Sequence, residues 1–324
     1  MKKVKNILLV IVLISIGIVT SSCKQDKKVV SIIQYISATA LDNAREGIIE
    51  GLKENGYVNG DNITIKVYNP QGKADTLATM AKTAVDKSDL IIAIATPAAL
   101  AVKSELEKQD SNVPMLFTAV TDPYEALVMD KNKSERISGT TDINPVEEQI
   151  KIIKEINPNA SKIGFIYTAS ESNSTIQLRL AKEAASKLNI EIIDRSCSNT
   201  TDLELVAESL INSNIDALYV PTDNEIASQM QLLSSICNQN KIVTICAEIG
   251  ELKDGGTITV GSVDYFELGK ITGKMGASVF DGEDITKMSV QKWESSDIEI
   301  NKTKIDEYNL PIPEELIKKA KKLY

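Results

Sequence analysis

Histidine is absent from this chain of 324 residues. The sequence therefore lacks the commonest general base and the commonest metal ligand of proteins. Catalysis by serine–histidine or cysteine–histidine pairs is excluded. Chemistry that uses carboxylates or lysines stays possible, so an enzyme with two catalytic carboxylates remains an open alternative.

Cysteines are few, and acidic residues outnumber basic ones. Beyond residue 23 the chain has only Cys197, Cys237 and Cys246, and their spacing fits no zinc pattern. We expect buried thiols, although an extracytoplasmic setting would permit one disulfide among them. We expect no metal and no cofactor. The net charge is −9, so the basic footprint of a nucleic-acid-binding protein is missing and no nucleic-acid partner is expected.

The N-terminus has the pattern of an export signal. Three early lysines precede an apolar run over residues 7–19, which is too short to span a bilayer comfortably. Small residues follow, and Cys23 comes directly after them. This order resembles the lipobox of bacterial lipoproteins, in which the cysteine carries a lipid and the cut falls just before it. The resemblance implies a signal peptide over residues 1–22 and a lipidated tether over residues 23–28 that anchors the protein outside the cell membrane. The alternatives are an ordinary secretory signal with an incidental cysteine and an uncleaved anchor.

Behind this leader, strand-like and helix-like segments alternate. Residues 29–35 and 90–95 are apolar runs of strand length, whereas residues 41–55 place their apolar side chains on one face of a helix. Single helices between consecutive strands indicate parallel sheets with helices on both faces. The pattern occurs twice, with a join near residues 139–145. The sequence therefore predicts an α/β fold of two doubly wound parallel-sheet lobes with a hinge and an interlobe cleft.

Ligands of such sheets bind outside the carboxyl ends of the strands, so the loops after strands form the candidate site. Thr96 is the expected N-cap of a helix with Pro97 in its first turn. The free N–H groups of Ala98 and Ala99 would then form an anion site. Residues 170–175 open a helix in the second half and offer similar groups. A carboxylate is the natural ligand for both.

Acidic and aromatic residues at other strand ends complement these helix starts. Asp223 is either the N-cap of a helix expected over residues 225–240 or the partner of a ligand's ammonium. Glu248 and Asp264 are further carboxylate candidates. Tyr35 ends the first strand and is the best-placed aromatic residue. Helix N-termini for a carboxylate, acids for an ammonium and a nearby ring together predict an amino-acid site.

Seven segments, taken together, resemble one known family. In chain order they read QYISATALDNAREGIIEGLKENGY, AIATPAAL, LFTAVTDPYEA, NPVEEQI, ESNS, YVPTDN and VDYFELG. They resemble the ABC-transporter substrate-binding lipoproteins of the tryptophan/tyrosine type over about residues 29–310. The resemblance implies a type 1 periplasmic-binding-protein fold that closes over its ligand through three hinge crossings. It implies a first lobe of residues 29–142 plus about 264–290, and a second lobe of residues 143–263 plus about 291–324.

The same resemblance implies which residues bind the ligand. They are Tyr35, Thr96, Ala98, Thr118, Asp122, Ser172, Asn173, Ser174, Asp223, Asn224, Glu248 and Asp264. Residues 36–39 depart from the stretch found in many relatives. The wall of the side-chain pocket, and the choice among aromatic, aliphatic and other solutes, therefore stay open.

We predict a non-enzymatic binding protein of an ABC importer. It captures a small amino-acid-like ligand, aromatic by resemblance, closes at a hinge near residues 140–145, and docks as a monomer on a membrane permease. Two alternatives remain: a ligand sensor for a signalling receptor, and a site for another solute such as a nucleoside.

Overall fold

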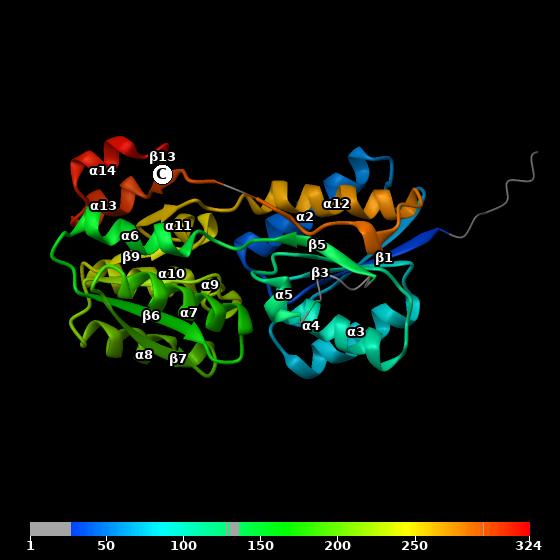
Figure 1. The fold of residues 1–324 in the computed structure, drawn as a ribbon, viewed down its shortest axis with the longest axis horizontal. Helices are drawn as coiled ribbons and strands as arrows, with labels where there is room; N and C mark the ends of the chain where they lie inside the picture. The colour runs from blue at the N-terminus through cyan, green and yellow to red at the C-terminus, as the bar shows by residue number, and fades with distance from the viewer. Residues whose placement is uncertain (1–26, 128, 130–135, 294) are drawn as a thin grey trace, which may run out of the picture.

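The computed structural model describes residues 27–127, 129, 136–293 and 295–324. The chain forms two lobes that lie end to end along the long axis of the molecule (Figure 1). Each lobe is a sheet covered by helices, so the predicted α/β fold of two parallel-sheet lobes is confirmed. The predicted signal peptide, Cys23 and most of the tether lie outside the described residues. Within the described part, no helix has the length and apolarity needed to cross a membrane.

The first lobe is built from the N-terminal third of the chain and a later return segment. The N-terminal elements are β1 (Lys28–Gln34), α2 (Thr39–Glu54), β2 (Ile63–Tyr68), α3 (Ala74–Lys87), β3 (Leu90–Ile94), α4 (Thr96–Lys108), β4 (Met115–Thr118), α5 (Pro123–Ala126) and β5 (Ile137–Thr141). The return segment contributes α12 (Tyr265–Phe280), η2 (Ile285–Lys287) and β11 (Gln291–Lys292). The strand order is β11-β5-β4-β3-β1-β2.

The second lobe contains the middle of the chain and its C-terminus. Its middle elements are α6 (Val146–Ile156), β6 (Lys162–Thr168), α7 (Ser172–Ser186), β7 (Glu191–Cys197), η1 (Thr200–Asp202), α8 (Leu203–Ile211), β8 (Ala217–Val220), α9 (Asn224–Ala227), α10 (Met230–Gln239), β9 (Val243–Cys246), α11 (Ile249–Lys253) and β10 (Ile258–Val260). Its C-terminal elements are β12 (Ile298–Ile300), α13 (Lys302–Tyr308), α14 (Glu314–Lys319) and β13 (Lys322–Leu323). The strand order is β13-β12-β10-β9-β8-β6-β7, and β12 runs antiparallel to β10.

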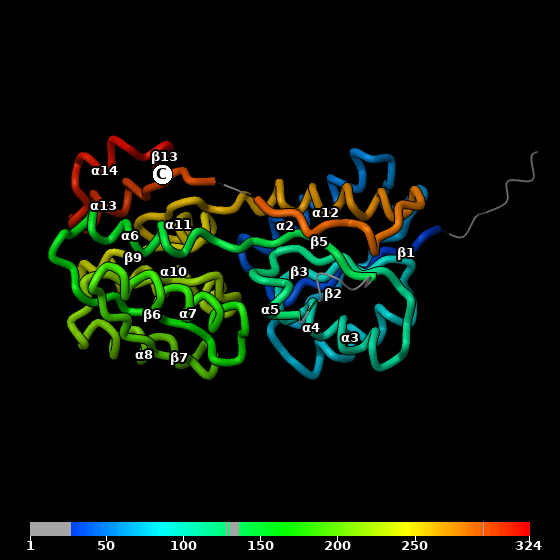
Figure 2. Tube along the Cα trace, in the orientation of Figure 1, coloured from blue at the N-terminus to red at the C-terminus, as the bar shows by residue number. Residues whose placement is uncertain are grey.

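The chain passes between the lobes three times, after β5, after β10 and after β11 (Figure 2). β11 pairs with Thr140 and Thr141 of β5, so residues 291–292 belong to the first sheet. The return to the second sheet therefore begins slightly later than the expected residue 291. Segments that cross between two packed lobes are the places where a hinge absorbs the backbone change of opening and closing.

The central strands are apolar because both of their faces are buried. All five residues of β3, LIIAI, are buried because this strand lies inside the sheet with helices on both faces. The second sheet likewise separates two apolar clusters, one around Phe165 and Tyr219 and the other around Leu218 and Leu233. The three cysteines beyond residue 23 are free and buried in the described structure.

Helices α2 and α12 pack with their backbones in contact. A Cβ atom on Gly47 would lie 2.0 Å from the carbonyl oxygen of Phe266, and one on Gly269 would lie 2.2 Å from that of Ala44. Only glycine permits such a close approach. Because α12 starts at Tyr265, this packing fixes the start of the return segment beside the first helix of the lobe.

One predicted helix is wrong in its extent. The segment 225–240 forms α9 and α10 rather than one helix. The Ser228 hydroxyl donates to the carbonyl oxygen of Glu225 at 2.7 Å. In a continuing α-helix the N–H of Gln229 would bond to Glu225 O. Here it bonds to Ile226 O, at 2.9 Å, and this tighter turn ends α9.

Candidate functional site: the interlobe cavity

A cavity lies between the lobes, at the carboxyl ends of the strands. Its volume is ≈ 10 Å³, about the space of one water molecule, so the two lobes almost meet across it. The first lobe contributes Ala38, Ala40, Leu41, Ala119 and Thr121. The second lobe contributes Asn173, Thr222, Asp223, Asn224, Ala227 and Glu248, and the crossings contribute Asp142 and Tyr265.

The lobes are in contact around this cavity. The Tyr35 hydroxyl lies 3.2 Å from Glu225 Oε1 of the second lobe and 3.3 Å from Gly72 O of its own lobe. Burial and the charges of Glu171 and Glu225 raise the pKa of Tyr35, so its hydroxyl stays protonated and can donate. Further contacts between the lobes join Thr39 to Asp254, Thr121 to Thr222 and Arg179 to Glu125, at 3.1, 3.5 and 2.8 Å. These contacts describe a closed arrangement.

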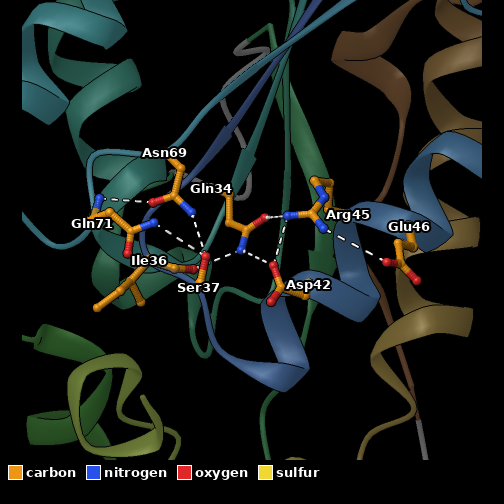
Figure 3. A network of polar contacts seen from close by, with 8 residues as sticks. All are labelled: Gln34, Ile36, Ser37, Asp42, Arg45, Glu46, Asn69 and Gln71. Atoms are coloured by element: carbon orange, nitrogen blue, oxygen red, sulfur yellow. Dashed lines mark hydrogen bonds and ion pairs between the residues drawn. The ribbon is translucent and has the colours of Figure 1, made fainter. Parts of the chain in front are cut away.

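The loop between β1 and α2 is held by a charged network (Figure 3). Arg45 Nη1 donates to Gln34 Oε1 at 2.7 Å and to Asp42 Oδ1 at 2.8 Å. Gln34 Nε2 in turn donates to Ile36 O and to Asp42 Oδ1, at 2.9 and 2.8 Å. The network therefore fixes the loop that brings Ala38 to the cavity wall.

Glu171 is the centre of a buried network in the second lobe. The sequence points to its loop, residues 170–175, but not to Glu171 as a site residue. Its carboxylate accepts hydrogen bonds from Asn173 Nδ2 at 3.0 Å and from the N–H groups of Asn224 and Glu225, both at 3.1 Å. The side-chain amide of Asn224 also donates to it. Burial and the charge of Asp223 raise the pKa of Glu171 to about 8, and the bonds from Asn173 and Asn224 oppose that rise.

Asp223 lines the cavity, but both of its carboxylate oxygens are already occupied. Oδ1 accepts from Ile226 N at 3.0 Å and from Thr168 Oγ1 at 2.9 Å. Oδ2 accepts from Thr168 N at 2.6 Å and from Ser174 Oγ at 2.7 Å. Of the two roles predicted for Asp223, the N-cap of α9 is the one that these contacts show.

A second acidic pair lies at the hinge. Asp142 follows β5 on the first crossing, and its Oδ2 accepts from the Tyr265 hydroxyl at 2.8 Å. Glu248 is the N-cap residue of α11 and interacts with the same hydroxyl. Burial raises the pKa of Glu248 to about 8, and the charge of Asp142 adds to the rise. Burial also raises the pKa of Asp142, against the effect of the Tyr265 and Thr121 hydroxyls.

Two helix N-termini add unpaired hydroxyls. Thr96 Oγ1 and Ser172 Oγ are buried without a hydrogen-bond partner in the described structure, and the helices that they begin, α4 and α7, contact each other across the lobes. The predicted N-cap at Thr96 is wrong by one residue. The N-cap is Ala95, which has φ 81° and whose N–H bonds to Thr118 O at 3.0 Å. Ala98 is buried in the first turn of α4.

The cavity lining includes four of the twelve predicted site residues, Asn173, Asp223, Asn224 and Glu248, and leaves out the other eight, among them Thr118, Asp122 and Asp264. Thr118 is buried in the first lobe, with its hydroxyl 2.8 Å from that of Thr140. Asp122 is the N-cap of α5, and Asp264 is the N-cap of α12. Among the described residues, no group of three or more His, Cys, Asp or Glu side chains is arranged to hold a metal ion.

The sequence model of the ABC transporter substrate binding proteins matches residues 29–324. The chain belongs to this family. Substrate-binding proteins of ABC importers work outside the cytoplasm.

Relatives of this ABC transporter substrate-binding protein agree with the assignment. The tyrosine-binding protein of Clostridioides difficile strain R20291 is 37% identical over 285 residues, which cover 87% of this chain and 80% of that protein. The crystal structure of an ABC domain in complex with L-Trp from Streptococcus pneumoniae is 30% identical, with TM-score 0.84, and the match covers 92% of this chain and 100% of that one. A ligand-free, open substrate-binding protein from Clostridium difficile is 32% identical, with TM-score 0.66, over 91% and 98% of the two chains.

The last two comparisons bear on the state of the lobes. The two solved structures have similar identity to this chain and similar coverage, yet the tryptophan complex superposes much better than the open, ligand-free structure. A different relative placement of two lobes lowers the overall similarity even when each lobe matches. The substrate-binding protein described here therefore has its lobes placed as in the liganded relative, in agreement with its interlobe contacts.

Proposed function

We propose that this substrate-binding protein captures an amino acid with an aromatic side chain. The observation that carries the proposal is the charge of the cavity. Asp142, Asp223 and Glu248 line it, and none of the described lysines and arginines does. Buried carboxylates without a cationic partner are unfavourable, so a ligand with an ammonium group suits this cavity better than a neutral solute.

The carboxylate end of an amino acid has a separate place. Helices α4 and α7 contact each other across the lobes, and the first residue of each, Thr96 and Ser172, carries an unpaired buried hydroxyl in the described structure. Helix N-termini attract anions through their free N–H groups and the helix dipole. We propose that the α-carboxylate binds at these two N-termini, with the N–H of Ala98 as a further donor.

The apolar part of the cavity favours a large side chain. Its lining consists of Leu41 and the four alanines Ala38, Ala40, Ala119 and Ala227. Alanine side chains take up little room, which suits a ligand with a bulky ring. The names of two relatives agree with this choice, because one binds tyrosine and the other is a complex with tryptophan.

In this proposal the ligand touches both lobes and thereby stabilises the closed form. A ligand shifts such an equilibrium only by its differential affinity for the two states. The closed protein, a monomer tethered to the membrane by lipidated Cys23, then delivers the amino acid unchanged to an ABC permease.

A thermal-shift screen of the chain from Lys24 onward tests the proposal. Tyrosine, phenylalanine and tryptophan are expected to raise the melting temperature, by mass action on the folded state. Trp293, the sole tryptophan, lies on the third crossing, so its fluorescence gives a second readout of closure with tyrosine or phenylalanine. Stabilisation by nucleosides or sugars, with none by amino acids, would overturn the ligand assignment. Mass spectrometry of the incubated ligand checks that it is recovered unchanged.

A further inference from the structure

Two buried aspartates line the cavity, and their hydrogen bonds differ. Asp223 is 1% exposed and receives four donors, all from the second lobe. Asp142 is 3% exposed and receives the Tyr265 hydroxyl on Oδ2, whereas its Oδ1 has no partner in hydrogen-bond geometry among the described residues. A buried carboxylate oxygen that lacks a donor costs free energy. Asp142 therefore has capacity for a ligand donor, and Asp223 has little.

A second buried carboxyl group lies beside Asp142. Glu248 is 4% exposed, lines the same cavity and shares the Tyr265 hydroxyl. A tyrosine hydroxyl has one proton to donate, and here Asp142 receives it. The two carboxyl groups thus share this donor, and besides it the Thr121 hydroxyl acts on Asp142 and the backbone N–H of Glu251 on Glu248. An ammonium group, with three donors and a positive charge, would satisfy both.

The location of this pair also suits a ligand that controls closure. Asp142 lies on the first crossing, Tyr265 directly follows the second crossing, and Glu248 belongs to the second lobe. An ammonium held between Asp142 and Glu248 would therefore join the hinge to the second lobe. A contact with Asp223 would involve the second lobe alone.

We propose that Asp142, together with Glu248, is the ammonium anchor of the site, and that Asp223 is a positioning residue that caps α9. This assignment rests on the proposed function, because it supposes a ligand with an amine. It places the determinant of amine specificity at the hinge, in a residue that the sequence analysis does not single out.

The experiment compares two ligands on matched variants of the full mature chain. The ligands are L-tyrosine and 3-(4-hydroxyphenyl)propionate, which lacks only the amine, and calorimetry gives both affinities. Asp142→Asn is expected to weaken tyrosine binding by about tenfold or more, as expected for loss of a charged hydrogen bond, and to leave the affinity for the propionate nearly unchanged. Asp223→Asn and the exposed control Asp86→Asn are expected to keep the wild-type ratio of the two affinities.

The readout is the ratio, so a general loss of stability does not imitate the effect. Melting temperatures identify any variant that fails to fold, and Glu248→Gln then serves as the second test of the anchor, with the same expected fall in the ratio. A ratio that falls in Asp223→Asn and not in Asp142→Asn would overturn the proposal.

A different result would show that the proposed function itself is wrong. If the wild-type chain binds no amino acid, the amine probe tyramine decides the present proposal by itself. Stabilisation by tyramine that is lost in Asp142→Asn supports the anchor, and no stabilisation of the wild-type chain by tyramine overturns it.

Discussion

The two lobes repeat one architecture but present different chemistry to the cavity. Among the described residues, the lining from the first lobe is mostly alanine and leucine and contains no charged side chain. The lining from the second lobe is mostly polar and is backed by the buried carboxylate of Glu171. The fold brings the strand ends together in both lobes, and the residues in the loops decide what each half can bind.

The difference extends to how each half is stabilised. In the second lobe, donors from the protein itself surround Glu171 and Asp223, which makes a rigid polar surface. In the first lobe, the cavity wall depends on a loop fixed by Arg45, outside the lining itself. We infer that the second lobe supplies the rigid polar half of the site, and that the first lobe supplies the shape of the side-chain pocket.

The largest expected effect is the loss of the second-lobe network. Glu171→Ala removes an acceptor that is 1% exposed and leaves the N–H groups of Asn224 and Glu225 unsatisfied at the start of α9. Each buried unsatisfied donor costs about 1–3 kcal/mol, so the free energy of unfolding should fall by about 3 kcal/mol. Urea unfolding measures this change.

The exposed Glu183 provides the matched control for Glu171. It forms an ion pair with Arg179 at 3.1 Å on the surface of α7. Surface pairs contribute about 0–1 kcal/mol, so Glu183→Ala should change stability little. Equal losses in the two variants would show that the second-lobe network has no special role.

The first-lobe wall is expected to control the size of the ligand. Ala38 is 8% exposed and lines the cavity. Ala38→Leu fills space that a ring would occupy, at a cost of about 1–3 kcal/mol, so the affinity for tyrosine should fall by about tenfold or more. Calorimetry with tyrosine and alanine checks that the larger ligand loses more. Ala78→Leu, at an exposed position on α3, should leave both affinities unchanged, and a tyrosine affinity unaltered by Ala38→Leu would contradict the assignment.

The acids of the second lobe also predict a pH dependence of stability. Burial raises the pKa of Glu171 and Glu248 from 4.5 to about 8 in the folded protein. Between these values the folded state binds protons that the unfolded state has released, so the stability of the ligand-free protein falls as the pH rises through this window. Melting curves across the window should show this slope, and the double variant Glu171→Gln and Glu248→Gln should flatten it. A stability that rises with pH would show that the two groups are ionised in the folded protein.

The sequence predicts most of the fold because apolar periodicity reports burial directly. The expected strands over residues 29–35 and 90–95 and the expected helix over residues 41–55 lie within two residues of the observed β1, β3 and α2. The segment ISGTT of β5, in contrast, has no long apolar run, so its pattern predicts no strand. Asp142 directly follows that strand, and for this reason it does not stand out as a strand-end acid.

The site is harder to predict because its contacts join distant parts of the chain. The hydrogen bond between Tyr265 and Asp142 spans 123 positions. Asp223 illustrates the same difficulty: whether it is a cap or a ligand contact depends on donors from Thr168 and Ser174, which only the folded structure brings to it. Local sequence identifies the loops, whereas the hydrogen bonds decide the role of each residue in them.

The smallest expected effect tests the contact between the two halves. The Tyr35 hydroxyl joins the first lobe to Glu225 of the second at 3.2 Å. Tyr35→Phe keeps the buried ring and removes this one hydrogen bond, which contributes about 0.5–1.5 kcal/mol, so tyrosine affinity should fall about two- to tenfold. Tyr57→Phe is the control, because its hydroxyl bonds to Asp281 at 2.7 Å within the first lobe. The control should lower the melting temperature without changing affinity. If Tyr35→Phe left the tyrosine affinity unchanged, ligand binding would not depend on direct contact between the two lobes. The ligand alone would then hold the lobes closed.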